Sequence, residues 1–341
     1  MKSIIDFIDD EFEKTLVDII GGSSSDISME DFNKTREKVI VTMLENADEL
    51  LSDSRCSKAG FLQRHGTLWK DSINILELVI NISTDAVIRY SDKCLSEDAD
   101  ITFHVIRQLH AKACVVAREL LCLVKGGLAD GAHTRWRTLH ELTVVAFFIK
   151  KYGEECAIRY YWHDHIECYH GMQQHKRYAS RLQAKAPTKQ DLKLGKQNYD
   201  LLLEKFGKAY AEPYGWATFS LKKPNISFAN LEKAVGLDHM RPYYKMSSYN
   251  VHAGSRAINF SLSAGKLAGS TLLLGESNAG MVVPMHSCAI SLVQITTLFL
   301  GLKSELGECL VIETLHLLER VLGVTLINRQ SDLDNLSLKA F

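Results

Sequence analysis

Apolar residues recur every three to four positions along most of this chain, which is the spacing of amphipathic helices. Glycine pairs or single glycines close several of these runs, and only five prolines interrupt 341 residues. The pattern therefore predicts an all-α fold, a multi-helix bundle with an N-terminal helical extension. The helices are expected at about residues 4–20, 28–51, 71–95, 101–124, 133–151, 154–183, 227–235, 238–254, 283–302 and 307–322.

The same pattern predicts three regions. Residues 1–60 are interpreted as the N-terminal helical extension, residues 61–322 as the helical bundle core domain, and residues 323–341 as a polar C-terminal tail. Residues 184–224 are basic and contain three prolines, so a looser connection is expected there.

Net charge, cysteine spacing and the distribution of charged residues limit the classes of protein to which this chain can belong. A formal net charge of -1 excludes a globally basic nucleic-acid binder but leaves room for a local basic patch. The first residues turn acidic where a signal peptide would continue apolar, and no cysteine pair has the C-x-x-C spacing. Residues 277–302 lack charged side chains, yet their many polar residues favour a buried central helix over a membrane span. We therefore expect a cytoplasmic protein with reduced thiols and no membrane contact.

Polar side chains concentrate in two segments. On a helix, His133, Arg137, His140 and Glu141 share one face, directly before an apolar run at 144–149. Such groups beside a core-facing run need partners or a function. The second segment is the helix expected at 238–254. The residues that we take from it are Tyr244, Ser248 and His252.

Together the two segments suggest a composite site for phosphate chemistry. Arg137 can hold a phosphate through two hydrogen bonds, and Glu141 can orient the cations. His140 or His252 can act as the base that removes a 2′-hydroxyl proton. Arg135, Tyr244 and Ser248 are the predicted supporting residues, and the chemistry needs no metal or other cofactor.

The order Arg137-x-x-x-Glu141, then Tyr244-x-x-Ser247/Ser248 and His252, resembles a large uncharacterised bacterial helical family of defence-like gene neighbourhoods. The resemblance covers roughly residues 100–300. That family is similar to the HEPN bundles, many of which are metal-independent endoribonucleases with an arginine and a histidine four to six residues apart. Two pairs here have that spacing, Arg135 with His140 and Arg159 with His165.

The resemblance implies a function and partners. It implies an endoribonuclease or RNA-directed toxin of antiviral defence, acting as a homodimer, with RNA as ligand and a protein partner in a defence system. It also implies that no metal takes part.

A basic stretch supports RNA binding. Between 176 and 196 there are seven cationic side chains and one acidic side chain, with aromatic residues nearby for base stacking. The alternative is an ordinary solvated helix face. The candidate nucleic-acid-binding residues are Lys176, Arg177, Arg181, Lys185 and Lys189.

Two other functions stay open. The bundle can be a non-enzymatic interaction module for protein or nucleic acid, with His252 as a hydrogen-bonded core histidine. It can also be a ferritin-like di-metal carboxylate protein, because two Glu-x-x-His motifs occur. The ligands in that case are Glu167 with His170, Glu313 with His316, and Glu119 and Glu141 as single carboxylates.

Overall fold

The computed structural model describes residues 3–20, 27–94, 100–252, 254–264, 273–302 and 306–339. It confirms the all-α prediction, since these ranges are helices and connecting turns without a β-strand. The chain divides into two compact units, Met1–Leu68 and Trp69–Phe341.

The first unit contains α1 (Ile4–Ile20), α2 (Met29–Glu45) and α3 (Ala47–Leu68). The α1 and α2 helices pack together through Phe12 and Phe32, whose ring centroids lie 5.5 Å apart. Ser28 caps α2 by accepting a hydrogen bond from the Asp31 amide at 3.1 Å. The helix expected over 28–51 is interrupted at Asn46, because the Asn46 side chain donates back to the Thr42 carbonyl at 2.7 Å. A new helix, α3, starts directly afterwards.

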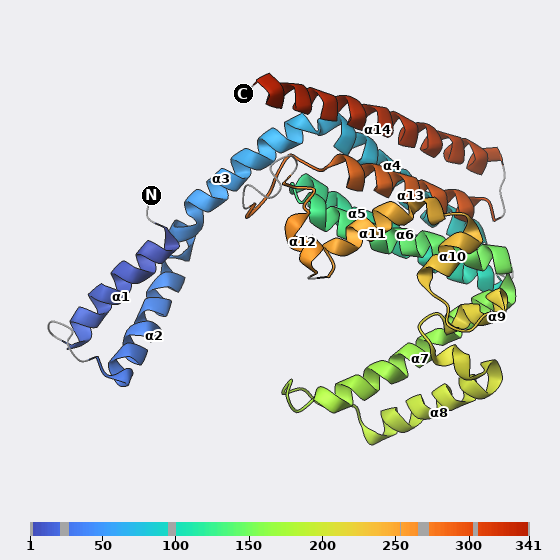
Figure 1. Cartoon of the computed structure of the whole chain (residues 1–341), viewed down its shortest axis with the longest axis horizontal. Coiled ribbons are helices and arrows are strands. Elements are labelled where there is room, and N and C mark those ends of the chain that lie inside the picture. Colours follow the sequence, from blue (N-terminus) through green and yellow to red (C-terminus); the bar gives the residue numbers. More distant parts are fainter. Residues whose placement is uncertain are drawn as a thin grey trace. The chain divides into compact units, whose positions relative to one another are not determined.

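The second unit is a bundle with shorter helices on one side (Figure 1). Its long helices are α4 (Lys70–Cys94), α5 (Ile101–Lys125), α6 (Ala129–Tyr152), α7 (Glu154–Tyr178), α8 (Lys189–Phe206), α13 (Val282–Leu300) and α14 (Leu306–Lys339). The shorter ones are η1 (Lys208–Ala211), η2 (Gly215–Ala217), α9 (Thr218–Leu221), α10 (Phe228–Val235), η3 (Asp238–Met240), α11 (Arg241–Tyr249) and α12 (Ser255–Asn259).

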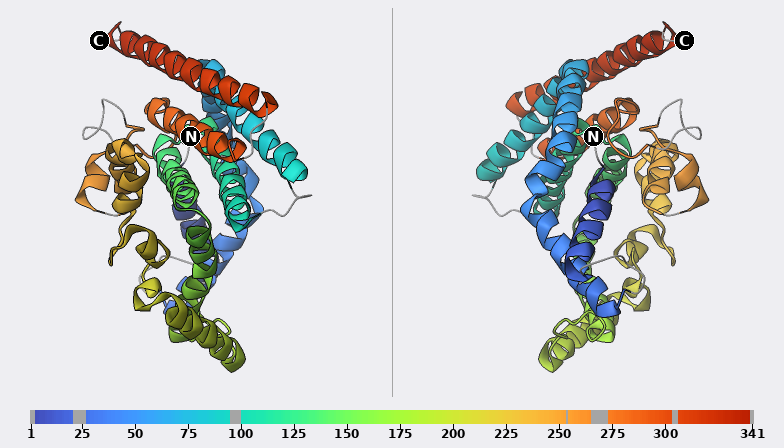
Figure 2. Two further views of the ribbon diagram at one scale, coloured as in Figure 1. Left: turned by 90° about the vertical axis from the view of Figure 1, so that its right-hand side faces the viewer. Right: turned by 90° about the vertical axis from the view of Figure 1, so that its left-hand side faces the viewer.

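The core of this unit is built around α13. This helix contacts α4, α5, α6 and α14, and it lies between α14 and the α5–α6 pair (Figure 2). Among the described residues, α13 alone is long and apolar enough to cross a membrane, with a mean hydropathy of 1.5. Because 61% of its apolar window is buried inside the bundle, α13 is a buried central helix of this unit.

The structure contains more helix than the sequence pattern predicts in two places. The region expected to be loose contains the α8 helix. A reciprocal pair of hydrogen bonds between Thr188 and Asp191 caps the start of this helix and stabilises it. The α14 helix continues to Lys339, through the residues assigned to a polar tail. No glycine or proline follows Gly323, and Leu326 is fully buried. By contrast, α7 ends at Tyr178, earlier than the predicted 183.

The arrangement of α6 places the polar stripe. Gly153 joins α6 to α7 with a φ of +77°, which a residue with a side chain rarely adopts. In the first turn of α6, the Asp130 carboxylate accepts hydrogen bonds from the Leu262 amide at 2.8 Å and the Ser263 amide at 3.1 Å. Since α10 and α11 both pack on α6, their side chains meet the stripe that the sequence places there.

Candidate functional site

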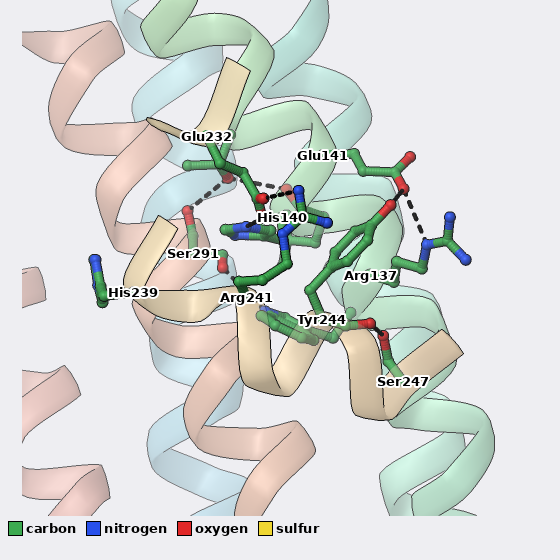
Figure 3. A network of polar contacts seen from close by, with 12 residues as sticks. Arg137, His140, Glu141, Glu232, His239, Arg241, Tyr244, Ser247 and Ser291 are labelled. Atoms are coloured by element: carbon green, nitrogen blue, oxygen red, sulfur yellow. Dashed lines mark hydrogen bonds and ion pairs between the residues drawn. The ribbon is translucent and has the colours of Figure 1, made fainter. Parts of the chain in front are cut away.

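A first polar cluster joins α6 to α11. Arg137 donates through Nε to Glu141 Oε1 at 3.0 Å, and the Tyr244 hydroxyl donates to the same carboxylate oxygen (Figure 3). The Arg137 guanidinium lies 4.7 Å from the Tyr244 ring centroid, a cation–π contact. The two helices that carry the sequence motifs therefore meet, and they do so through Tyr244. Arg137 and Glu141 are 25% and 35% exposed, so this cluster reaches the surface.

The contacts in this cluster fix the charge of its members. Burial alone would lower the pKa of Arg137, but its contacts with Tyr244 and Glu141 outweigh burial and raise that pKa. Burial, together with the hydrogen bond and charge of Glu141, raises the pKa of Tyr244. At neutral pH the cluster therefore holds a permanent cation, paired with the Glu141 carboxylate, and a protonated phenol, which excludes Tyr244 as a base.

A second cluster lies behind the first and is buried. His140 donates through Nε2 to Glu232 Oε1 at 3.0 Å, and neither side chain is exposed. Arg241 Nη2 forms an ion pair with the other Glu232 oxygen at 2.5 Å. The Arg241 guanidinium also lies 5.2 Å from the Tyr244 ring centroid. Two arginines thus flank one tyrosine ring, each paired with its own glutamate (Figure 3).

Glu232 and Arg241 were not among the predicted site residues, yet the sequence holds a signal for Glu232. In α10, Phe228, Leu231 and Glu232 fall on one helical face, and all three are buried. A glutamate on an apolar face needs a cation or a donor. The partner is His140, 92 positions earlier in the chain, which only the tertiary fold identifies.

Arg135 and His140, the pair with the HEPN spacing on α6, point to different partners. Arg135 pairs with Glu119 of α5 and donates to the Thr138 hydroxyl at 3.3 Å, whereas His140 faces α10. Side chains five positions apart lie about 140° apart around a helix. This helix therefore does not bring the two side chains into one site.

The other pair of that spacing separates in the same way. Arg159 donates to Glu155 at 2.7 Å and lies 4.4 Å from the Phe206 and Phe219 rings. His165 instead stacks on Trp162 with ring centroids 5.4 Å apart.

His252 lies outside the helix predicted to carry it. The α11 helix ends at Tyr249, because Asn250 turns its side-chain amide to Asp130 at 3.0 Å. His252 is exposed and its side chain has no hydrogen bond or ion pair within the described ranges, so it is not the core histidine of the interaction-module hypothesis. Ser248 donates to the Tyr244 carbonyl at 2.9 Å, which supports α11 rather than His252.

The predicted RNA-binding residues are together on the surface. Lys176, Arg177, Arg181, Lys185 and Lys189 are all exposed and follow the end of α7, the turn, and the start of α8. The α7 and α8 helices pack side by side, so this stretch forms the tip of a helical hairpin (Figure 1). The guanidinium groups of Arg177 and Arg181 lie 5.3 Å and 6.0 Å from the exposed Tyr178 ring. This stretch, residues 176–189, is called the cationic tip below.

The residues considered for a di-metal site have separate contacts. Glu119 pairs with Arg135, and Glu141 with Arg137 and Tyr244. His316 lies 3.2 Å from the Thr297 hydroxyl, and the His170 ring contacts Tyr199. Within the described parts of the chain, no three histidine, cysteine or acidic side chains converge as metal ligands would.

Two buried histidines make stability depend on pH. Burial lowers the pKa of His133 from 6.5 to about 4, although the nearby Asp130 charge opposes it, and burial lowers the pKa of His110 to about 3. Between those values and 6.5 the unfolded chain binds protons that the folded chain does not. The stabilising contribution is therefore fully present above pH 6.5 and is lost as the pH falls toward 4.

We expect the shift of His133 alone to lower the free energy of unfolding by about 2 kcal/mol between pH 7 and pH 5. Urea titrations of the wild type and of His133→Phe at both pH values measure this contribution, because phenylalanine keeps a ring on Trp136 without titrating. The variant should lose less stability on acidification. An identical loss in both proteins would refute the assignment to His133.

Residues 103–266 match DUF5677, a family of unknown function. No curated protein and no solved structure matched the chain. The matched segment runs from α5 past α12, so it contains both polar clusters and the cationic tip. The DUF5677 match supports the predicted resemblance to an uncharacterised family, whereas the relation to HEPN bundles stays a prediction.

Proposed function

We propose that this protein is RNA-directed and binds the RNA backbone through its cationic tip. The observation that carries the proposal is the set of five exposed cations at the end of a helical hairpin, two of which lie beside the exposed Tyr178 ring. Phosphates attract such cations, and a base can stack on the Tyr178 ring. The chain as a whole is nearly neutral, so the attraction is local to this tip.

The binding test compares two variants with the same change in charge. A triple alanine variant at Arg177, Arg181 and Lys185 should bind a fluorescently labelled 20-nucleotide single-stranded RNA more weakly than the wild type. Losing three phosphate contacts should reduce the slope of log affinity against log salt by about 2. The control is a triple alanine variant at Lys34, Lys38 and Lys58, which are exposed on α2 and α3.

Fluorescence anisotropy at several salt concentrations, from roughly 50 to 200 mM, measures both the affinity for the RNA and the slope of log affinity against log salt. If the two triple variants weaken binding equally, net charge rather than the cationic tip is responsible and the proposal fails. If the wild type does not bind the RNA, the proposal fails as well.

Metal-independent RNA cleavage, of the HEPN-like endoribonuclease or toxin type, is the second candidate. It is favoured by the partly exposed Arg137 guanidinium, which Glu141 and Tyr244 hold in one orientation. Arg137 is the phosphate clamp in this proposal, and Glu141 orients it. Of the two histidines considered as base, His140 is buried against Glu232, which leaves the exposed His252.

Incubation of a mixed RNA pool with purified protein, with and without EDTA, tests cleavage. The expected result is cleavage that survives EDTA and falls by about 100-fold or more in Arg137→Ala. Arg137→Lys keeps the charge but loses the paired donors, so it should restore little activity. Cleavage abolished by EDTA would indicate a metal site instead, and no cleavage in either condition would leave binding without catalysis.

A further inference from the structure

Two cavities adjoin each other along α7, outside the polar clusters and away from the cationic tip. The larger, of about 680 Å³, lies among α5, α6, α7 and the segment 213–216. The smaller, of about 270 Å³, lies between α7 and α8. Both are lined by Trp162 and His165, whose rings stack 5.4 Å apart at an angle of 17°. Trp162 is 42% exposed, so one large aromatic surface faces solvent where the cavities meet.

The larger cavity combines aromatic walls with hydrogen-bond acceptors. Tyr160, Tyr161 and Trp216 line it, and so do the Asp164 and Glu167 carboxylates. These groups favour a flat ligand that can stack and that carries donors at its edge. A nucleobase with an amino group and a ring N–H fits that description.

His163 adds another acceptor to this cavity. Its Nε2 donates to the Tyr210 and Glu212 carbonyls, at 3.0 Å each, which leaves Nδ1 without a proton in the neutral ring. Burial lowers the pKa of His163, so the ring is neutral at pH 7. Guanine presents adjacent N1–H and N2 amino donors, which match paired acceptors on a carboxylate, whereas uracil offers one N–H.

The smaller cavity offers complementary chemistry. Leu201 and Leu202 give it an apolar wall, Asn198 supplies an amide, and Lys205 supplies a cation. Lys112 is the cation of the larger cavity. A base can therefore lie on each side of the Trp162–His165 stack, while the lysines attract the linking phosphates.

We propose that the Trp162–His165 stack separates two adjoining base-binding subsites, which hold two successive nucleotides of single-stranded RNA, with guanine in the larger cavity. The choice of RNA rests on the proposed function. The positions of the stack and of the cationic tip agree with RNA as the ligand. Trp162 and Arg177 lie on the same helix, about 22 Å apart at 1.5 Å per residue. A single strand can follow α7 from the stack to the cationic tip.

The test uses the dinucleotide GpG, with UpU for comparison, and isothermal titration calorimetry on the full-length protein. Wild type should bind GpG saturably and more tightly than UpU. Trp162→Ala should weaken GpG binding by about tenfold, since one stacked base contributes an effect of that order. Trp162→Phe should stay within about threefold of wild type, because a stacking ring remains.

Two controls separate the stack from general effects. Tyr243→Ala removes another exposed aromatic ring, on α11, and should leave GpG binding unchanged. Asp164→Asn together with Glu167→Gln should reduce the preference for GpG over UpU. Wild type that does not bind GpG saturably, or Trp162→Ala that binds it like wild type, would overturn the inference.

The failure of this inference is distinguishable from failure of the proposed function. If the 20-nucleotide RNA binds through the cationic tip but GpG binding ignores Trp162, only the subsites are refuted. If the RNA binding does not depend on the tip but GpG binding depends on Trp162, the subsites stand and the tip proposal falls. A dGpdG arm separates RNA from single-stranded DNA, and tighter binding of dGpdG would overturn the assignment to RNA.

Discussion

Replacing Trp136 with alanine is expected to lower the free energy of unfolding by about 3–5 kcal/mol, the range for emptying a large aromatic site in a core. Trp136 is fully buried, stacks between His133 and His140 at ring distances of 5.4 Å and 5.3 Å, and donates from its indole to the Ser291 hydroxyl at 3.0 Å. The loss should combine a cavity with an unpaired hydroxyl on α13. Urea unfolding followed by circular dichroism measures it.

Trp162 provides the matched control, because the same substitution there removes a surface ring. Since 42% of Trp162 is exposed, Trp162→Ala should cost about 1 kcal/mol or less. Equal destabilisation by the two variants would contradict the core position of Trp136. This control also shows whether the Trp162 variant used in nucleotide binding is folded.

The second large effect is expected at Glu232. Glu232→Ala should lower the free energy of unfolding by about 3–5 kcal/mol, because it leaves a buried imidazole and a half-buried guanidinium without their acceptor. Glu232→Gln should cost less, since the amide oxygen still accepts from His140. Urea unfolding at pH 7 distinguishes the two.

Two further variants test whether the loss of stability comes from the buried cluster around Glu232. Asp200→Ala breaks the exposed Lys196–Asp200 pair on α8 and should change stability by about 0.5 kcal/mol or less. Combining Glu232→Leu with His140→Phe and Arg241→Met replaces the whole cluster by apolar groups and should recover much of the lost stability. If Glu232→Ala is as mild as Asp200→Ala, the buried cluster does not contribute as its geometry indicates.

The polar stripe on α6 shows what helical spacing can predict and what it cannot. His133, Arg137, His140 and Glu141 were expected on one face of one helix, and α6 carries all four. Their burial and their partners differ nevertheless. Arg137 and Glu141 are part-exposed and pair with each other, His140 is buried against Glu232, and neither ring nitrogen of His133 has a partner among the described residues. A periodicity of 3.6 residues gives direction around the axis but not depth within the bundle.

The second motif segment shows the same limit at a helix end. The periodic pattern continued to 254, whereas α11 ends at Tyr249, because Asn250 and the backbone near 262 are drawn to Asp130. Asp130 lies 120 positions before Asn250. Local propensity could not reveal that competition, since the competing hydrogen bonds come from another helix.

The sequence by itself determined the all-α class, most helices, the buried character of α13 and the exposed cations between α7 and α8. These follow from hydrophobic periodicity and local charge, which act over a few turns of chain. Only the tertiary structure decided that Tyr244 meets Arg137 and Glu141, that Glu232 takes His140 and Arg241, and that Trp162 and His165 divide two cavities. The contacts of Tyr244 and Glu232 join elements far apart in the chain, and the two cavities lie between such elements, so all three depend on how helices pack against one another.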